Sequence, residues 1–224
     1  MKTLCAALVL LSLVSVCQPA SLACEKLVKP LDRDPDMTGR WYFIAMSSEV
    51  CLVSAFVNAL LWPSVSMDVI SKDTPNHYSE VTYGKMHGVC FNANTSFVYA
   101  NSSLVEVNSD NTPAEDPDAM LQTSCPDCVV VKEEMNTLLL LSKRPAVTAT
   151  ELKEFEMQAE CLGWSKPEIL NTDHDYRSCA SLEDIDEDEI IQVLQSFFQK
   201  MLERVTNTYH IISKCVNVWQ MVSF

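Results

Sequence analysis

The stretch MTGRWYFIA, residues 37–45, decides the fold. It places Gly39 and Trp41 at the entrance to a run of aromatic and β-branched residues, directly after a lead-in rich in Pro and Asp (PLDRDPD). Residues of these types favour strands. We therefore expect a first strand at residues 39–47. The Gly-x-Trp pattern is short, so its meaning depends on the rest of the chain.

Further β-prone segments follow at near-regular spacing, at residues 64–71, 77–86, 89–99, 102–108, 118–124, 128–133 and 136–143. Turn-forming sequences such as KDTPN and NSDNTPAEDPD separate them. Eight short strands in this arrangement are typical of an antiparallel barrel or sandwich. The apolar residues 50–62, between the first two segments, fit either a helix or a buried loop.

The periodicity becomes helical after Pro145. A threonine near position 148 or 150 can cap a helix, and Gly163 can end it. Between them, apolar residues recur at helical spacing, at Leu152, Phe155, Ala159 and Leu162. This pattern predicts one amphipathic helix that buries its apolar face on the outside of the strands.

The first 23 residues have the features of a secretory signal peptide: Lys2, then an uncharged and mostly apolar run, then small residues. The run is short for a membrane span, so a retained signal anchor is the weaker alternative. Cleavage after Ala23 is expected, with Ala20 as the alternative. The sequons at Asn94 and Asn101 are expected to carry glycans. We predict a protein secreted into a plasma-like extracellular fluid.

Composition excludes several classes of partner. The chain of 224 residues has a net charge of −14, which repels nucleic acids and anionic membranes. After the signal peptide, the sequence predicts no transmembrane segment. We divide the chain into a signal peptide at residues 1–23, one domain at 24–183, and a C-terminal extension at 184–224. An acidic linker (SLEDIDEDEI) and a second amphipathic helix, near residues 188–205, form this extension.

Three quoted segments resemble one protein family, the lipocalins. They are CEKLVKPLDRDPDMTGRWYFIA, GVCFNANTSFVYA and ATELKEFEMQAECLGW with the later YRSC. Within this family they are most similar to apolipoprotein M, orosomucoid and the pufferfish saxitoxin- and tetrodotoxin-binding proteins. The resemblance runs from about Cys24 to Cys179. It implies a 3₁₀ turn, an all-β, eight-stranded antiparallel up-and-down barrel, and one α-helix packed outside.

The resemblance also implies roles for structural residues. Gly39 lets the backbone approach closely at the base of the barrel, and Trp41 closes that base. A basic residue at the end of the last strand packs across the Trp41 ring as a cation–π contact. Arg144 matches this position, with Lys143 as the alternative.

Eight cysteines follow the expected signal peptide, and in an exported chain an even number indicates disulfides. The resemblance implies the pairs Cys24–Cys161 and Cys90–Cys179. Cys125 and Cys128 (CPDC) could be a redox pair or half of a zinc site, but a strand-like VVVKEE follows and no second CxxC exists. We expect a structural bridge there, local or to another cysteine. Cys51 and Cys215 match no pattern.

The barrel interior, which we call the calyx, is the expected ligand site. Aromatic residues on the strands or at the mouth are the candidate contacts: Phe43, Trp62, Tyr83, Phe97 and Tyr99. A slip of one residue in a strand would turn each of these side chains outward. Glu80 and Glu106 are candidate counter-ions for a cation.

The charge of the strands bears on the ligand. Between Ser64 and Ser142 there are three lysines, no arginine and eleven acidic residues. A buried phosphate or carboxylate normally needs Arg or Lys. A neutral apolar or cationic molecule, such as a guanidinium toxin or a basic drug-like compound, therefore fits this sequence better than a phosphorylated lipid.

The sequence is compatible with three functions. The first is a secreted carrier of a small apolar or amphipathic molecule, with no catalytic residues, no metal and no cofactor. The second is a lipoprotein-associated transport protein, in which the helix near 188–205 docks on lipid or on a partner. The third is an enzyme with a free thiol in the calyx, for which Cys51 is the candidate.

Overall fold

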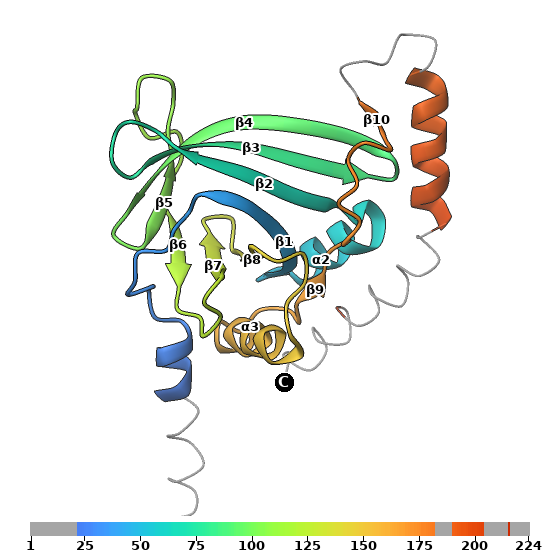
Figure 1. The fold of residues 1–224 in the computed structure, drawn as a ribbon. Coiled ribbons are helices and arrows are strands. Elements are labelled where there is room, and N and C mark those ends of the chain that lie inside the picture. Colours follow the sequence, from blue (N-terminus) through green and yellow to red (C-terminus); the bar gives the residue numbers. More distant parts are fainter. Residues whose placement is uncertain (1–21, 182–189, 204–214, 216–224) are drawn as a thin grey trace, which may run out of the picture.

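The computed structural model describes residues 22–181, residues 190–203 and Cys215. The expected signal peptide at residues 1–23 therefore lies almost wholly outside the described residues, as do the acidic linker and most of the chain after position 203. Figure 1 shows one barrel with a helix, α3, packed outside it.

Eight antiparallel strands form the barrel, in an up-and-down order. Each strand pairs with the next along the chain, and the pairings β1–β8 and β4–β5 keep the ring closed. The strands are β1 (Gly39–Ser48), β2 (Ser64–Ser71), β3 (His77–Met86), β4 (Val89–Ala100), β5 (Ser103–Glu106), β6 (Asp118–Leu121), β7 (Cys128–Glu133) and β8 (Thr137–Ser142). The expected eight-stranded barrel is confirmed.

Alternation along the strands separates two apolar clusters. The inner cluster surrounds Trp41 and includes Met67, Phe97 and Val131. The outer cluster lies between the barrel and α3 and includes Val130 and Phe155. Successive side chains of a strand point to opposite faces, so Val130 and Val131 belong to different clusters. An irregularity in β1 between Phe43 and Ala45 shifts the register against β8.

The helix α3 (Ala149–Cys161) covers the outer cluster as predicted. Thr148 and Glu151 form a capping box, in which each side chain bonds the backbone N–H of the other residue. Phe155 and Ala159 are buried against the barrel wall. The residues between β8 and α3 thus supply the helix cap. The apolar face of α3, with Phe155 and Ala159, then packs on the barrel.

Several short elements flank the barrel. Residues 22–27 form an α-helix in place of the expected 3₁₀ turn, and Val28 N–H bonds the Cys24 carbonyl at 3.0 Å. The ambiguous segment 50–62 is helical, as α2 (Cys51–Phe56) and a π-helical turn, η1 (Val57–Leu61). Two short strands, β9 (Glu168–Ile169) and β10 (Ala180–Ser181), pair with β1 and β4. Residues 190–203 form the C-terminal helix.

Four disulfides tie the described residues together. Cys24–Cys161 and Cys90–Cys179 are the pairs that the resemblance implies. Cys125 pairs with Cys128, which resolves the alternatives for CPDC in favour of a local bridge. Cys51 pairs with Cys215 across 164 residues of sequence, which the cysteine spacing did not indicate.

Trp41 closes the base of the barrel, but the basic residue over its ring is not the expected one. The indole N–H of Trp41 donates to the Met37 carbonyl at 2.7 Å. Lys143 Nζ lies 5.2 Å from the ring centroid. The expectation for Arg144 is therefore wrong. Its guanidinium turns to the outer side, where it pairs with Asp127 at 2.7 Å and Glu151 at 2.8 Å.

Replacing Trp41 should test this closure. Trp41 is only 1% exposed, so Trp41→Ala leaves a large cavity and should lower the free energy of unfolding by about 3–5 kcal/mol. Lys143→Met removes the cation–π contact and the partly exposed ion pair of Lys143 with Asp36 at 3.2 Å, and should cost only about 1 kcal/mol. Urea denaturation of both variants, with disulfides intact, measures the difference. Equal and small losses would contradict the account.

Candidate ligand-binding site

The strand register determines which side chains face the calyx. Trp41 pairs with Met67, Met67 with Thr82, and Thr82 with Ala93. Since directly paired residues of neighbouring strands lie on the same face, this row points inward with Trp41. Residues two positions away along each strand share that face.

The lower part of the calyx is apolar and aromatic. Phe97 and Tyr99 belong to the buried cluster around Trp41, and Phe43 packs against it. The Tyr78 ring stacks on Phe97 with centroids 5.1 Å apart. The Tyr99 hydroxyl donates to the Arg33 carbonyl at 3.2 Å, which helps to close the base. Three of the five predicted contact residues therefore face the interior.

Of the other two predicted contacts, Tyr83 faces outward, whereas Trp62 lies at the mouth, one of the two places where such contacts were expected. Tyr83 pairs with Ser66 and so points outward. Its ring lies 5.8 Å from that of Tyr176 and beneath the guanidinium of Arg40. The prediction for Tyr83 is thus wrong, because its parity along β3 is opposite to the one we assumed. Trp62 lies at the mouth, is 38% exposed, and has a left-handed backbone conformation at the end of η1.

A row of carboxylates lines one side of the calyx. Glu80 pairs with Val69, and Glu106 pairs with Phe97, which places both on the inner face. Asp118 and Glu133 lie two residues from the buried Met120 and Val131, on the same face of β6 and β7. We call Glu80, Glu106, Asp118 and Glu133 the acidic wall.

Two hydroxyl groups hold Glu80 in place. Thr95 Oγ1 donates to Glu80 Oε1 at 2.8 Å, and Thr82 Oγ1 donates to the same oxygen at 3.4 Å. These bonds orient the carboxylate without involving its second oxygen. On the opposite side of the wall, the backbone N–H of Glu134 donates to Asp118 at 3.3 Å.

Burial and mutual repulsion raise the pKa of several of these carboxyl groups. Burial raises the pKa of Glu80, and the charge of Glu106 adds to this effect although the threonine hydroxyls oppose it. Burial also raises the pKa of Asp118, with Glu115 and Glu106 adding to it. The pKa of Glu133 rises to about 7 through burial and the charges of Asp118 and Glu115. No basic residue of the described part of the chain contributes to the pKa of these three carboxyl groups.

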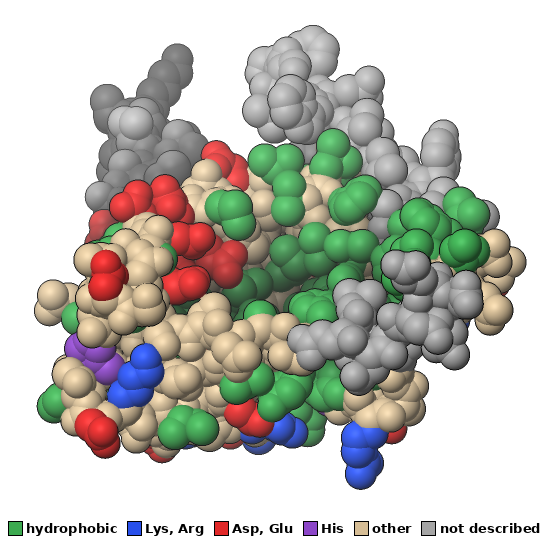
Figure 2. Space-filling view, turned by 90° about the horizontal axis from the view of Figure 1, so that it is seen from above, with side chains coloured by type: hydrophobic (Ala, Val, Ile, Leu, Met, Phe, Trp, Pro, Cys, Tyr) green, Lys and Arg blue, Asp and Glu red, His purple; other side chains and the backbone are tan. Residues whose placement is uncertain are grey.

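A depression of about 430 Å³ opens beside the acidic wall. Its lining includes Glu115, Asp118, Glu133 and Glu134 together with Ala114 and Met135. Figure 2 shows a hollow with a hydrophobic interior and a group of acidic side chains along one side of it. Apolar and acidic side chains thus lie next to each other on this face of the molecule.

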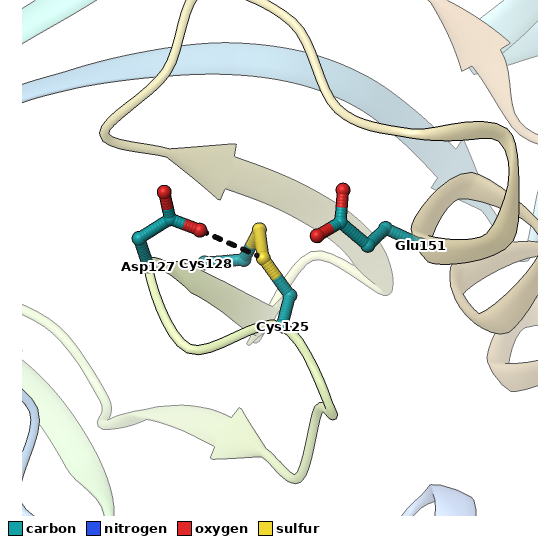
Figure 3. Close-up of side chains that lie close together, drawn as sticks. All are labelled: Cys125, Asp127, Cys128 and Glu151. Atoms are coloured by element: carbon teal, nitrogen blue, oxygen red, sulfur yellow. Dashed lines mark hydrogen bonds between the residues drawn. A yellow bond between two sulfur atoms is a disulfide. The ribbon is translucent and has the colours of Figure 1, made fainter.

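A second group of potential ligands lies at the base, outside the barrel. Sulfur and carboxylate atoms of Cys125, Asp127, Cys128 and Glu151 lie within 4.8 Å of one another (Figure 3). Both sulfurs are joined in a disulfide, and thiolates are the form that binds metal. The Arg144 guanidinium bonds both carboxylates and lies 3.4 Å from Cys125 Sγ. This group is therefore structural: a disulfide beside two carboxylates whose charge is balanced by Arg144.

The free thiol that an enzyme would need is absent at the predicted position. Cys51 is bonded to Cys215. The disulfide removes the observation on which the enzyme hypothesis rested, because a disulfide sulfur cannot act as a thiolate nucleophile.

Sequence reasoning missed several calyx residues. Phe91 lies across Gly84, and a Cβ on Gly84 would lie 2.0 Å from the Phe91 ring, so this position excludes larger residues. Tyr78, Asp118 and Glu133 were also missed. The strand alternation could have identified all of them once Trp41 was set to point inward.

The two sequons are accessible in the fold. Asn94 pairs with Val81, in the outward row that contains Arg40 and Asp68, and it is exposed. Asn101 lies exposed in the turn between β4 and β5. Glycans at either position would project away from the calyx, and their presence stays a prediction.

Replacing Glu133 should change stability in a pH-dependent way. In the unfolded chain this carboxyl ionises near pH 4.5, so the native protein binds an extra proton between about pH 4.5 and 7, and its stability falls as pH rises through this window. Glu133→Gln should therefore stabilise the protein by about 1–2 kcal/mol at pH 8, after allowance for partial exposure, and by almost nothing at pH 4.5. Urea denaturation at both pH values measures this. An equal effect at both would refute the assignment.

The chain was compared with curated proteins and with solved structures. Among curated proteins, none matches this sequence significantly. One similar solved structure is the siderocalin Ex-FABP, described as functioning through dual ligand specificities, with 16% identity, a TM-score of 0.47, and coverage of 59% of this chain and 92% of that one. Another is the odorant-binding protein OBP1, with 14% identity, a TM-score of 0.46, and coverage of 65% and 98%.

The family comparison is more informative because it extends over most of the chain. The sequence matches the ApoM domain over residues 4–184. This range contains the whole barrel and α3, and it ends before the C-terminal helix. The chain therefore belongs to the ApoM domain family, within the lipocalins.

Proposed function

We propose that this protein is a secreted carrier that binds a small hydrophobic or amphipathic molecule in its calyx, and that the preferred ligand combines an apolar body with a positive charge. The apolar part lies on the floor formed by Phe43, Phe97 and Tyr99, and its burial supplies most of the binding free energy. The charged part lies against the acidic wall. No bond is made or broken, so the protein is not an enzyme.

The observation that carries this proposal is the acidic wall. Carboxylates that are partly removed from water and close to one another are costly to ionise together. The raised pKa values of Glu80, Asp118 and Glu133 reflect this cost. A ligand cation relieves the repulsion and is attracted more strongly than in bulk water, because the local dielectric constant is lower.

The positions of the basic residues support the same ligand class. The three lysines between Ser64 and Ser142 all bind partners on the outside of the barrel. Lys85 pairs with Asp173 at 2.7 Å, Lys72 donates to Ser96 at 2.7 Å, and Lys132 lies over Trp164. Arg40 pairs with Asp68 on the outer face. Among the described residues only Lys72 lies near the acidic wall, in a depression that Glu106 also lines, so an anionic lipid head group would meet more carboxylates than cations.

Secretion and glycosylation are part of the proposal. The disulfides are typical of an exported protein, and the sequons at Asn94 and Asn101 are accessible. Among the described residues, no helix is long and apolar enough to cross a membrane. Guanidinium toxins and basic drug-like amphiphiles are the ligand classes that this chemistry suits.

Lipoprotein-associated lipid transport is the second candidate. The ApoM domain match and the exposed apolar residues of the C-terminal helix favour it. The acidic wall distinguishes the two candidates, because a carrier of phosphorylated lipid needs positive charge in the calyx.

A series of ligands with equal chain length tests the charge preference. We expect decylguanidinium to bind more tightly than decanol, and decanol more tightly than decanoate, with about tenfold between steps, which corresponds to about 1.4 kcal/mol. Isothermal titration calorimetry at pH 7.5 measures the three affinities. Glu80→Gln, at the partly buried carboxylate of the acidic wall, should weaken decylguanidinium binding about fivefold to tenfold and leave decanol binding unchanged.

The matched control is Glu160→Gln, which removes one exposed carboxylate from α3, far from the calyx interior. It should leave all three affinities unchanged, since an exposed charge is screened by salt. Decanoate binding as tight as that of decylguanidinium would overturn the charge preference. Failure of all three to bind correctly folded protein would overturn the carrier function itself.

A further inference from the structure

The chain between β9 and β10 forms a strap across the outside of the barrel. It begins at Leu170, whose N–H donates to the Ile44 carbonyl at 2.9 Å, and it ends at Cys179, which is bonded to Cys90. Between these points, residues 171–178 form neither helix nor strand. In Figure 1 the strap runs from β9 past the ends of β2 and β3 to β10. Both of its ends are fixed, so its middle can leave the barrel while the barrel stays folded.

His174 makes the central contact between the strap and the barrel. Its Nδ1 lies 2.8 Å from Ser64 Oγ and 3.1 Å from the Tyr176 hydroxyl, within hydrogen-bonding distance of both. The centroid of its ring lies 4.7 Å from that of Tyr42. Ser64 is fully buried and belongs to the outward row of β2. The imidazole therefore fills the space between the strap and the outer face of β1 and β2.

The other ring nitrogen of His174 distinguishes the neutral ring from the charged one. Nε2 is buried, and no group in the part of the chain that the structure describes forms a hydrogen bond with it. A neutral imidazole carries one proton, which Nδ1 can share with the hydroxyls of Ser64 and Tyr176. An imidazolium carries a proton on each nitrogen, so a buried Nε2–H would lack an acceptor, which is costly. The closed strap thus fits the neutral ring.

The charges around His174 have the same effect. Burial lowers the pKa of His174 below its usual value, and Arg40 adds to this effect although Asp173 opposes it. The charge of Asp173 is itself balanced by Lys85, whose Nζ lies 2.7 Å away. The other titratable groups of β1, β2, β3 and the strap in this region are Tyr42, Asp68, Tyr83, Asp175, Tyr176 and Arg177.

The strap also holds the segment at the mouth of the calyx. Asn171 N–H donates to the Pro63 carbonyl at 3.1 Å, directly after the segment 50–62. Just before the strap, Glu168 accepts a hydrogen bond from Asn58 Nδ2 at 2.8 Å. A displaced strap would therefore remove one of the bonds that fix the mouth segment to the barrel.

We propose that His174 is an acid-sensitive switch: when its ring takes up a proton from solvent, residues 171–178 leave the outer face of the barrel and the mouth segment loosens. The Cys90–Cys179 disulfide and the pairing of β9 with β1 keep the strap attached, so the change is local and reversible. It does not depend on which ligand the calyx binds. Since a solvated histidine ionises near pH 6.5, the open strap binds the proton more tightly than the closed one and gains population below about this pH.

Hydrogen exchange of the full chain, with its disulfides intact, tests the proposal at pH 7.5 and pH 5.5. After correction for the intrinsic effect of pH on exchange, peptides covering residues 170–178 should exchange about fivefold faster or more at pH 5.5, because the strap opens locally. Peptides from β7 and β8 should not change. The midpoint of the strap response should coincide with the titration of the His174 ring, followed by NMR.

Three variants separate His174 from other groups. His174→Asn keeps a side chain that can bond the hydroxyls of Ser64 and Tyr176 but does not titrate, so its strap should exchange equally slowly at both pH values. His77→Asn removes a histidine whose ring bonds the Pro75 carbonyl, away from the strap, and should respond like the wild type. Glu133→Gln removes the wall carboxyl with a pKa of about 7 and should also respond like the wild type.

Several results would overturn the proposal. They are equal strap exchange at both pH values in the wild type, a pH response that persists in His174→Asn, and a strap midpoint that differs from that of the His174 ring. An acid response of equal size in all strands would also overturn it, because the whole barrel would then be opening rather than the strap.

Discussion

The inward direction of Trp41 at the base of a closed antiparallel ring is the constraint on which the rest of the structure depends. Its indole N–H bonds the Met37 carbonyl and Lys143 lies over its ring, so its orientation is fixed on both sides. In a closed ring every strand is paired on both edges, so this one orientation sets the parity of all eight strands. A slip of one residue would place Glu80 in solvent and Tyr83 in the calyx.

Because alternate residues of each strand face inward, the interior of the barrel has two different surfaces, one apolar and one acidic. Near the base, the inward positions are aromatic and aliphatic, and they pack as an ordinary core. Toward the open end, β5, β6 and β7 each place one carboxylate inward, at Glu106, Asp118 and Glu133, and Glu80 adds a fourth from β3. The protein tolerates their repulsion, which is visible in the pKa of Glu133 at about 7. Since unrelieved repulsion costs stability, a cationic ligand is the simplest reason for such a wall.

The sequence predicted the barrel well because turn residues and alternation are local signals. Strand bounds at β2, β3 and β7 agree with the predicted ranges. It was harder to predict which side chains of a strand face inward. The irregularity near Phe43 and the choice between neighbouring residues depend on packing between strands that are distant in the sequence. Thus Tyr83 and Arg144 were placed on the wrong sides, and the Cys51–Cys215 pair had no local signal. In the sequence alone, Asp118 and Glu133 lie in acidic stretches that are typical of solvated turns. Only the pairing of the strands shows that both side chains lie on the inner face of the barrel.

The central claim is that the calyx holds an apolar cation, and the most direct test is to identify what the protein carries. Native mass spectrometry of the protein from its own source, followed by extraction and identification of the bound molecule, makes this measurement. The account predicts one small molecule per chain, with an apolar body and a positive charge, released as pH falls from 8 to 5. A phosphorylated or carboxylate lipid in the calyx would contradict it.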